Sequence, residues 1–302
     1  TKTLEPLKPS YVSTVDSGNL ASYLIVLLEG LDELETNPII DRQVLEGIRD
    51  TISVYGNMDT DKMLDLFPKH IMARDFTLTR WYRILMSIDE GEQSELKEPL
   101  NAYINEIDEL LPWVKILTDI PDFLLETAGS YRDINRRLLE LLSLLNHPLA
   151  MQDYISSYQE ILDTLSDIGL AMENDTHRDT SYHIALKWFE ELQYALEMSF
   201  ENLKRLLVRI DSLKEDIETL FDDMDFGSLY DSSKELFSIG YDIENETLTN
   251  SYYDLLASEA RQASFIAIAK GDIPKRHWFK MGRALTMIEN NKVLLSWSRT
   301  MF

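Results

Sequence analysis

Apolar residues recur every three or four positions along most of the chain, which predicts helices rather than strands. Near the start, this spacing predicts a helix over residues 17–34. Five leucines are expected to form its single buried stripe: Leu20, Leu24, Leu27, Leu28 and Leu31. Thr14, Asp16 and Ser17 offer side-chain oxygens that can bind the free N–H groups at the start of this helix.

The next part of the chain is helical but less regular. Pro38 suits the first turn of a helix that continues to about residue 55, because proline has no N–H to satisfy there. A short amphipathic piece is expected around 63–67. Three prolines punctuate the irregular stretch 76–129: Pro99, Pro112 and Pro121. Further leucines at helical spacing predict another helix around 138–145.

Two long helices are predicted at 149–172 and from about 180 to 221, joined by a polar turn. In the second, leucine and isoleucine alternate in steps of three and four between 203 and 220, which is a heptad seam. An antiparallel helical hairpin is the simpler interpretation. A coiled-coil dimer remains the alternative, although the seam covers under three heptads.

The pattern changes after residue 224. Residues 229–243 combine β-type residues with turn formers, which predicts a short β-hairpin. A helix is expected over 255–270, with Gly271 as its C-terminal cap. A short helix should contain Trp278, and 293–298 is a possible strand.

Two helical stretches resemble each other. Residues 21–25, ASYLI, align with 263–267, ASFIA, and tyrosine and glycine flank both in similar places. Repeated helical units build toroids and solenoids, because each unit buries its apolar face against a neighbour. The repeat predicts that helices 17–34 and 255–270 lie side by side, with Asp16 and Glu259 facing one cavity.

The chain has 302 residues and a formal net charge of −24. This charge argues against binding to nucleic acid and against docking on an anionic membrane surface, since both require clustered Lys and Arg. No cysteine is present, and the five histidines lack a metal-ligand spacing, so neither a disulfide framework nor a cofactor or metal site is predicted. No apolar run is long enough to insert into a membrane. The sequence begins without Met and stops after an apolar stretch, which suggests a part of a larger protein.

Candidate chemistry gathers in 253–261. Asp254 and Glu259 are the natural acid–base pair, but five residues on a helix separate them by roughly 140°. Asp254 either caps its helix or contacts a sugar. Glu259 lies among small and apolar residues, so it either pairs with Arg261 or another cation, or faces a polar cavity.

A second polar group surrounds Asp16. Ser17 and Asn19 can bind hydroxyl groups, and Gly18 permits close approach of a backbone or a ligand. Aromatic side chains can stack on sugar rings, although packing in the core is their commoner role. Three aromatic residues are candidates for such stacking: Tyr11, Tyr253 and Trp297.

Several blocks of the chain resemble the middle region of bacterial cyclic β-1,2-glucan synthases. The resemblance is strongest over 1–36 and 226–302. It rests on TKTLEPLKPSYVSTVDSGNLASYLIVLLEGL, LFSIGY, YYDLLASEARQASFIAIAKGDIP followed by HWFKMGR, and LLSWSRTMF. The intervening helices match mainly in position and type.

The resemblance implies a large membrane-bound parent protein with several catalytic parts. One part extends β-1,2-glucan from UDP-glucose, and a phosphorylase-like part trims it. Between them, a glycoamylase-like (α/α) toroid closes the glucan into a ring by transglycosylation. This chain resembles the first part of that toroid, which implies a position on the cytoplasmic side of the bacterial inner membrane. Its implied partners are β-1,2-glucan and the other domains of the same polypeptide.

The resemblance assigns no catalytic acid to this chain. The glutamates expected to close the ring belong to motifs similar to GISES and GFYEA, and neither occurs here. The matching blocks imply a set of substrate-facing residues instead: Asp16, Ser17, Asn19, Tyr253, Asp254, Glu259 and Arg261.

The expected fold is therefore all-α: a partial (α/α) toroid with a long inserted helical hairpin and a small β-hairpin. Residues 1–36 would form the first toroid segment, 37–222 the helical insertion, and 223–302 the β-hairpin with the second toroid segment. Two other functions remain open, a non-catalytic helical scaffold or binding module and a stand-alone β-1,2-glucan hydrolase using Asp254 and Glu259. A half toroid should expose apolar faces on helices 17–34 and 255–270.

Overall fold

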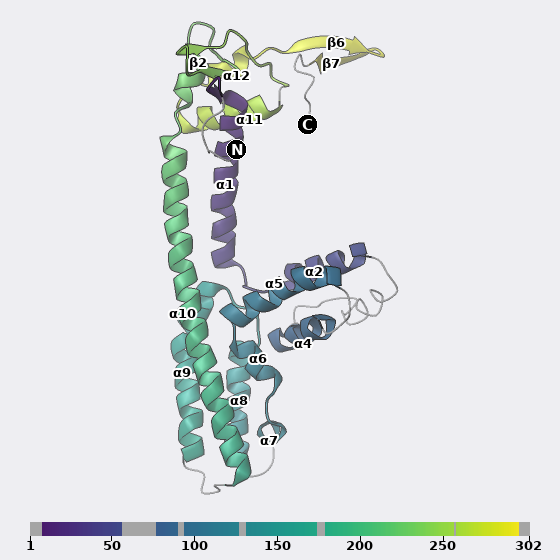
Figure 1. Cartoon of the computed structure of the whole chain (residues 1–302), viewed down its shortest axis with the longest axis vertical. Helices are drawn as coiled ribbons and strands as arrows, with labels where there is room; N and C mark the ends of the chain where they lie inside the picture. Colours follow the sequence, from purple (N-terminus) through teal and green to yellow (C-terminus); the bar gives the residue numbers. More distant parts are fainter. Residues whose placement is uncertain are drawn as a thin grey trace. The chain divides into compact units, whose positions relative to one another are not determined.

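The computed structural model describes residues 8–55, 77–89, 94–126, 131–173, 179–256 and 258–295. Of these described residues, 69% are helical and the rest include a few small sheets, so the mainly-α prediction is confirmed. The chain divides into two compact units, and we call residues 1–31 with 212–302 unit 1, and residues 32–211 unit 2. The boundaries lie inside helices α1 and α10 (Figure 1).

The described part of unit 2 consists of helices, including the last residues of α1 and most of α10. Their bounds are α1 (Thr14–Thr36), α2 (Arg42–Tyr55), α4 (Leu78–Asp89), α5 (Ser94–Leu110), α6 (Trp113–Thr118), α7 (Asp122–Leu125), α8 (Arg132–Leu145), α9 (Met151–Glu173) and α10 (Thr180–Asp223). The apolar spacing explains the packing: Leu138, Leu141 and Leu145 are all buried on one face of α8. The amphipathic piece predicted at 63–67 lies outside the described residues.

The stretch 76–129 is more regular than predicted, since the described part of it contains α4 to α7. Two of the prolines taken as interruptions stand at helix starts. Pro112 immediately precedes α6, and Pro121 immediately precedes α7. A proline is tolerated at a helix start because the first backbone N–H groups have no partner within the helix.

The helical hairpin predicted from the two long segments is confirmed as α9 and α10 (Figure 1). The rings of Tyr158 and Phe200 stack between them, with centroids 3.8 Å apart and planes 8° from parallel. The predicted heptad seam is buried only in part. Leu203 and Ile210 are at most 5% exposed, whereas Leu213 is 43% exposed.

Polar side chains of α10 bind the C-terminal carbonyls of two shorter helices. The Ser199 hydroxyl donates to the Leu110 carbonyl at 2.6 Å, and the Asn202 amide donates to the Glu109 carbonyl at 2.6 Å. The Trp188 indole donates to the Ile116 carbonyl at 3.3 Å. The last carbonyls of a helix have no partner within it, so these bonds fix the ends of α5 and α6.

Replacing Ser199 by alanine is expected to destabilise the chain by about 1–3 kcal/mol, because the buried Leu110 carbonyl loses its donor. Urea unfolding followed by circular dichroism measures the change. Ser156 is the matched control, since its exposed hydroxyl donates only to Asp153 in its own helix. Equal free energies of unfolding for Ser199→Ala and Ser156→Ala would show that the carbonyl does not depend on Ser199.

Unit 1 contains short strands together with α11, α12 and the adjoining parts of α1 and α10. Its strands are β1 (Tyr11–Ser13), β2 (Tyr230–Asp231), β3 (Leu236–Phe237), β4 (Gly240–Asp242), β5 (Thr247–Leu248), β6 (Ala284–Ile288) and β7 (Asn291–Leu295). A 3₁₀ turn, η2 (Phe226–Leu229), precedes β2, and α11 (Ser258–Lys270) and α12 (Arg276–Lys280) follow β5.

The predicted β-hairpin over 229–243 is present as β2 paired with β3, but its last residues belong to another sheet. There β4 lies between β1 and β5 in the order β1-β4-β5, with both pairs antiparallel. Gly240 is required where β1 crosses β4. A Cβ at this position would lie 2.4 Å from the Val12 carbonyl oxygen and from the Tyr11 ring.

The core of unit 1 joins α1 to α11 through small residues. Its buried members are Ala21, Phe226, Leu229, Phe237, Ala263, Ile266, Ala267 and Ile273. The end of α10 is held by Lys270, whose ammonium donates to the Asp222 carbonyl at 2.8 Å and to the Met224 carbonyl. A cation at the C-terminus of a helix also interacts favourably with the helix dipole.

The C-terminal elements of the described chain agree with prediction in type. Trp278 lies in α12, and the strand predicted at 293–298 corresponds to β7, with residues 296–298 outside the described part. β7 pairs with β6 across a turn in which Glu289 and Asn290 both have positive φ, as a type I′ hairpin requires. Among the described helices, none has the length and hydrophobicity that a membrane span needs.

Candidate functional site

The first group of predicted site residues lies at the start of α1. Ser13 is the N-cap, because its hydroxyl accepts a hydrogen bond from the Asp16 N–H at 3.2 Å. The prediction that Thr14, Asp16 and Ser17 supply the cap is therefore wrong. Asp16 lies in the first turn with its side chain exposed, where a carboxylate favours the positive end of the helix dipole. The Ser17 hydroxyl donates to the Ser13 carbonyl at 2.7 Å.

Thr14 fixes the start of α1 against the strands. Its hydroxyl donates to the Ser238 carbonyl at 2.7 Å, and its N–H donates to the Ile239 carbonyl at 3.1 Å. Both Thr14 and Ser238 are fully buried, so these bonds are shielded from water. The first turn of α1, which carries Asp16, is consequently fixed to the short segment between β3 and β4.

Helices α1 and α11 lie side by side, as the internal repeat predicts. The contact is made at Gly18 and Ala263, where a Cβ on Gly18 would lie 2.4 Å from the Ala263 Cβ and 2.7 Å from its Cα. Only glycine allows two helix backbones to approach this closely. The second half of the prediction, that Asp16 and Glu259 face one cavity, stays a prediction because the Glu259 side chain lies outside the described part of the structure.

Asp254 does not belong to α11, which begins at Ser258 rather than at 255. The separation of roughly 140° from Glu259 on one helix therefore does not apply. Whether Asp254 caps α11 stays a prediction, because residue 257 lies outside the described part of the structure. The Asp254 carboxylate accepts a hydrogen bond from the Leu256 N–H at 2.9 Å. Leu255 donates in turn to the Gly282 carbonyl at 3.0 Å, which ties this loop to the start of β6.

The loop that carries Tyr253 and Asp254 is also anchored by Asp231. The Tyr252 hydroxyl donates to the Asp231 carboxylate at 2.6 Å. The hydroxyls of Ser233 and Tyr252 together lower the pKa of Asp231 to about 2, so it is ionised at neutral pH. The Lys234 ammonium lies 4.3 Å from the centre of the Tyr252 ring and donates to Asn250 at 2.8 Å. The half-buried Tyr253 is thus presented by a loop fixed on both sides.

Arg261 lies on the exposed surface of α11, two positions before the contact residue Ala263. Asp16 likewise lies two positions before the contact residue Gly18 on α1. Two residues along a helix turn the side chain by about 200°, so both charged groups point away from the buried contact and into solvent. The structure thereby places a carboxylate and a guanidinium on the outer faces of two touching helices.

Ser264 of α11 and His277 of α12 form a buried pair that the residue pattern did not predict. The Ser264 hydroxyl lies 2.8 Å from His277 Nε2, and His277 Nδ1 lies 3.1 Å from the Glu235 carbonyl. A carbonyl only accepts, so Nδ1 carries the proton, and in the neutral ring Nε2 accepts from Ser264. Burial lowers the pKa of His277, although the bond to Glu235 opposes this.

This pair resembles a nucleophile and its base but is not accessible. Ser264 and His277 are each only 1% exposed, so neither water nor a sugar reaches the hydroxyl. The pair instead joins α11 to α12 and to the β2–β3 hairpin. The Glu235 carboxylate adds to this connection by pairing with Arg276 at 2.7 Å and Lys280 at 3.1 Å. The sequence does contain one indication of this pair, because Ser264 is a polar residue among the buried alanines of α11.

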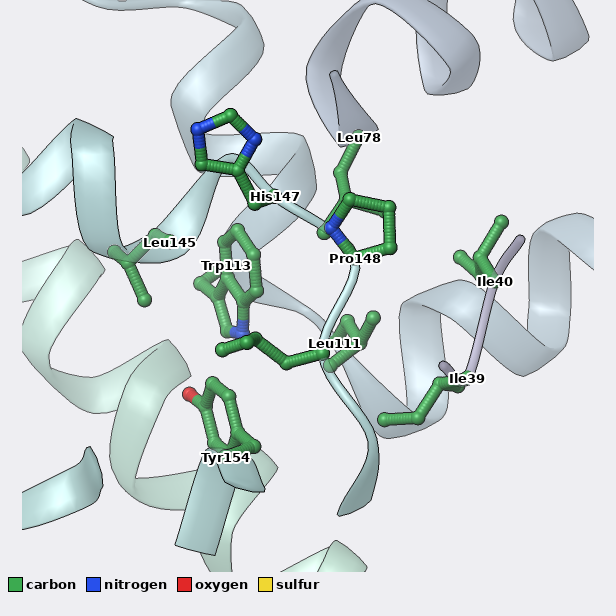
Figure 2. Close-up of a pocket in the computed structure, with 10 residues that line it drawn as sticks. Ile39, Ile40, Leu78, Leu111, Trp113, Leu145, His147, Pro148 and Tyr154 are labelled. Atoms are coloured by element: carbon green, nitrogen blue, oxygen red, sulfur yellow. The ribbon is translucent and has the colours of Figure 1, made fainter. Parts of the chain in front are cut away.

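Three pockets among the described residues lie in unit 2, and none of the seven predicted residues lines any of them. Figure 2 shows the smallest of the three. Its volume is about 10 Å³, and its wall is formed mostly by apolar side chains around Trp113, His147 and Tyr154. Within the described ranges, no three His, Asp or Glu side chains are grouped to hold a metal ion.

Comparison with known proteins gives one informative match. The chain is 28% identical over 311 aligned residues to the cyclic β-(1,2)-glucan synthase NdvB of Rhizobium meliloti strain 1021. The alignment covers 100% of this chain but only 9% of NdvB. No protein-family model matches the sequence. The full-length match agrees with the resemblance inferred from the 1–36 and 226–302 blocks and extends it across the intervening helices.

Proposed function

We propose that this chain, a segment of an NdvB-like protein, supplies one wall of the domain that closes linear β-1,2-glucan into rings by transglycosylation. The observation that carries the proposal is similarity to a cyclic β-(1,2)-glucan synthase along the entire chain. Because the chain spans 9% of that protein, the remaining catalytic parts belong elsewhere in the parent polypeptide.

The exposed apolar face of α1 supports the proposal that this segment is one part of a larger toroid. Leu20, Tyr23, Val26 and Leu27 are between 46% and 73% exposed, and Leu24 and Leu31 are buried on the other face. The predicted single buried stripe is therefore wrong: α1 is apolar on both faces. A helix that is apolar all round is normally buried, so its outer face suits a neighbouring helix of the same toroid. On α11, Phe265 is exposed in the same way.

In this proposal the segment binds and orients sugar rather than breaking bonds. Ring closure needs an acid that protonates the leaving oxygen and a carboxylate that assists transfer of the glycosyl group. Those acids would come from other parts of the parent. The exposed Asp16 and Arg261 would hydrogen-bond sugar hydroxyls, and Tyr253 would pack against a sugar ring.

Asn19 and Ser17 are half-buried beside Asp16 and would complete the polar wall at the start of α1. Asp254 and Glu259 remain members of the proposed set. The first is held by its loop, and the second lies in the first turn of α11. Unit 2 contains none of these seven residues, which favours a scaffold role for its helices beside the sugar-binding role of unit 1.

The proposal predicts that removing both charges impairs ring closure in the whole parent protein. In the double variant Asp16→Asn, Arg261→Gln, cyclisation of supplied linear β-1,2-glucan should fall about 10- to 100-fold, chiefly through a higher KM. Hydrogen bonds to charged groups contribute roughly 1.5–3 kcal/mol, which corresponds to this range. Chromatography of cyclic and linear products measures the rate.

Arg209→Gln is the matched control, because Arg209 is also an exposed arginine on a long helix but lies in unit 2. The control should cyclise glucan at the wild-type rate. A double variant as active as the control would remove Asp16 and Arg261 from the sugar-binding wall.

A further inference from the structure

Helices α2, α4 and α5 of unit 2 surround an apolar cavity of about 120 Å³. The cavity beside Trp113 is much smaller, at about 10 Å³. Protein interiors contain few voids larger than a water molecule, so a space of about 120 Å³ requires an explanation. An engineered apolar cavity of roughly 150 Å³ binds benzene. The cavity between α2, α4 and α5 is therefore of a size to accept a single six-carbon ring.

Each of the three helices contributes buried apolar side chains to the wall of this cavity. Leu45 and Ile48 come from α2, Trp81 and Leu85 from α4, and Ile107 from α5. All five are at most 5% exposed. An apolar group that enters such a space leaves water for an apolar environment, which is favourable. The wall therefore favours the apolar part of a guest molecule over water or a sugar.

An acidic group lies at the mouth of the cavity. Glu106 of α5 lines the cavity and is also exposed to solvent, so it lies where the two meet. Partial burial raises the pKa of Glu106, and the negative charge of Glu109 raises it further. A cation beside Glu106 would oppose both effects, because it stabilises the ionised carboxylate. Tyr103, three positions earlier on α5, also lines the cavity and supplies an aromatic ring that can interact with a cation.

We propose that this cavity binds a small organic cation, with its apolar group between α2, α4 and α5 and its ammonium paired with Glu106 at the mouth. The net charge of −24 on the chain favours the approach of a cation over that of an anion. An anion with the same apolar group would meet the negative charges of Glu106 and Glu109. The site lies in unit 2, so it goes beyond the proposed sugar-binding role of unit 1 and does not depend on it.

Three probes with the same ring and different charge test the proposal on the 302-residue chain. Benzylamine is a cation at pH 7, benzyl alcohol is neutral and benzoate is an anion. In titrations followed by nuclear magnetic resonance, benzylamine should bind about tenfold more tightly than benzyl alcohol, and benzoate should not bind detectably. Ring protons of bound benzylamine should show nuclear Overhauser effects to the methyl groups of Ile48 and Ile107, which line the cavity.

Two variants separate the role of the charge from that of the cavity. Glu106→Gln should weaken benzylamine binding about tenfold and leave benzyl alcohol binding unchanged. Glu98→Gln is the matched control, since Glu98 is an exposed glutamate about two turns earlier on α5 that does not line the cavity. Val44→Phe places a phenyl ring in the cavity and should abolish binding of both probes, with circular dichroism as the check on folding.

The proposal would be overturned if benzylamine failed to bind the wild-type chain. It would equally be overturned if Glu106→Gln bound benzylamine as tightly as Glu98→Gln, or if benzoate bound as tightly as benzylamine. Because Glu106 is exposed and its replacement keeps the size of the side chain, this comparison remains decisive even if Val44→Phe does not fold.

Discussion

Replacing Gly18 by alanine is expected to destabilise unit 1 by about 3 kcal/mol or more, because the added methyl group would overlap α11. The added Cβ would lie 2.7 Å from the Ala263 Cα, which is a backbone atom and cannot rotate away. Overpacking usually costs about 1–3 kcal/mol when side chains relax, and a rigid backbone contact costs more. The strain can be relieved only by separating α1 from α11.

Gly30 provides the matched control on the same helix. A Cβ there meets nothing within 4 Å, so Gly30→Ala should stabilise the chain by roughly 0.5–1 kcal/mol through the better helix propensity of alanine. Urea unfolding of the two variants therefore gives opposite signs. If both shift the free energy of unfolding in the same direction, α1 and α11 do not touch at Gly18.

Replacing His277 is also expected to cost much of the stability of unit 1, and to change its response to acid. His277→Ala removes a buried ring that joins Ser264 to the Glu235 carbonyl and packs edge-on against Phe237 at 4.8 Å. The lost packing and the unpartnered carbonyl together should cost about 3 kcal/mol. Denaturant unfolding at pH 7.5 measures this loss.

The sign of the pH dependence follows from the lowered pKa of His277. Above the ordinary histidine pKa of about 6.5, the ring is neutral in both the folded and the unfolded chain. As the pH falls below that value, the unfolded state takes up the proton first, so stability is lost progressively. His277→Gln should abolish this part of the acid sensitivity. His183→Gln, which alters an exposed histidine, should retain it.

The residue pattern predicted where helices form better than it predicted which of their faces are buried. The hairpin of α9 and α10 followed from two uninterrupted apolar repeats, because long periodic segments have few alternatives. The buried face of α1 did not follow, because leucines occur on both of its faces. The choice between them depends on Ala21 and Gly18, whose small size allows α11 to approach.

The sequence predicted that α1 and α11 meet at the candidate site. It did not predict the hydrogen bonds that hold the site together. The repeat correctly brought α1 and α11 together. The cap at Ser13 was not predicted, because Ser13 is also the last residue of the three-residue strand β1. The links between Ser264 and His277, and between Thr14 and Ser238, join residues far apart in the sequence. Such long-range polar pairs leave no periodic signal, so only the folded chain shows them.

Hydrogen exchange of the whole parent protein, with and without linear β-1,2-glucan, tests most directly whether this segment forms a sugar-binding wall. Bound glucan should slow exchange of backbone amides in 13–20 and 251–263, the two stretches that carry the seven proposed residues. Linear β-1,3-glucan should leave both unchanged. Protection confined to parts of the parent outside this chain would contradict the account.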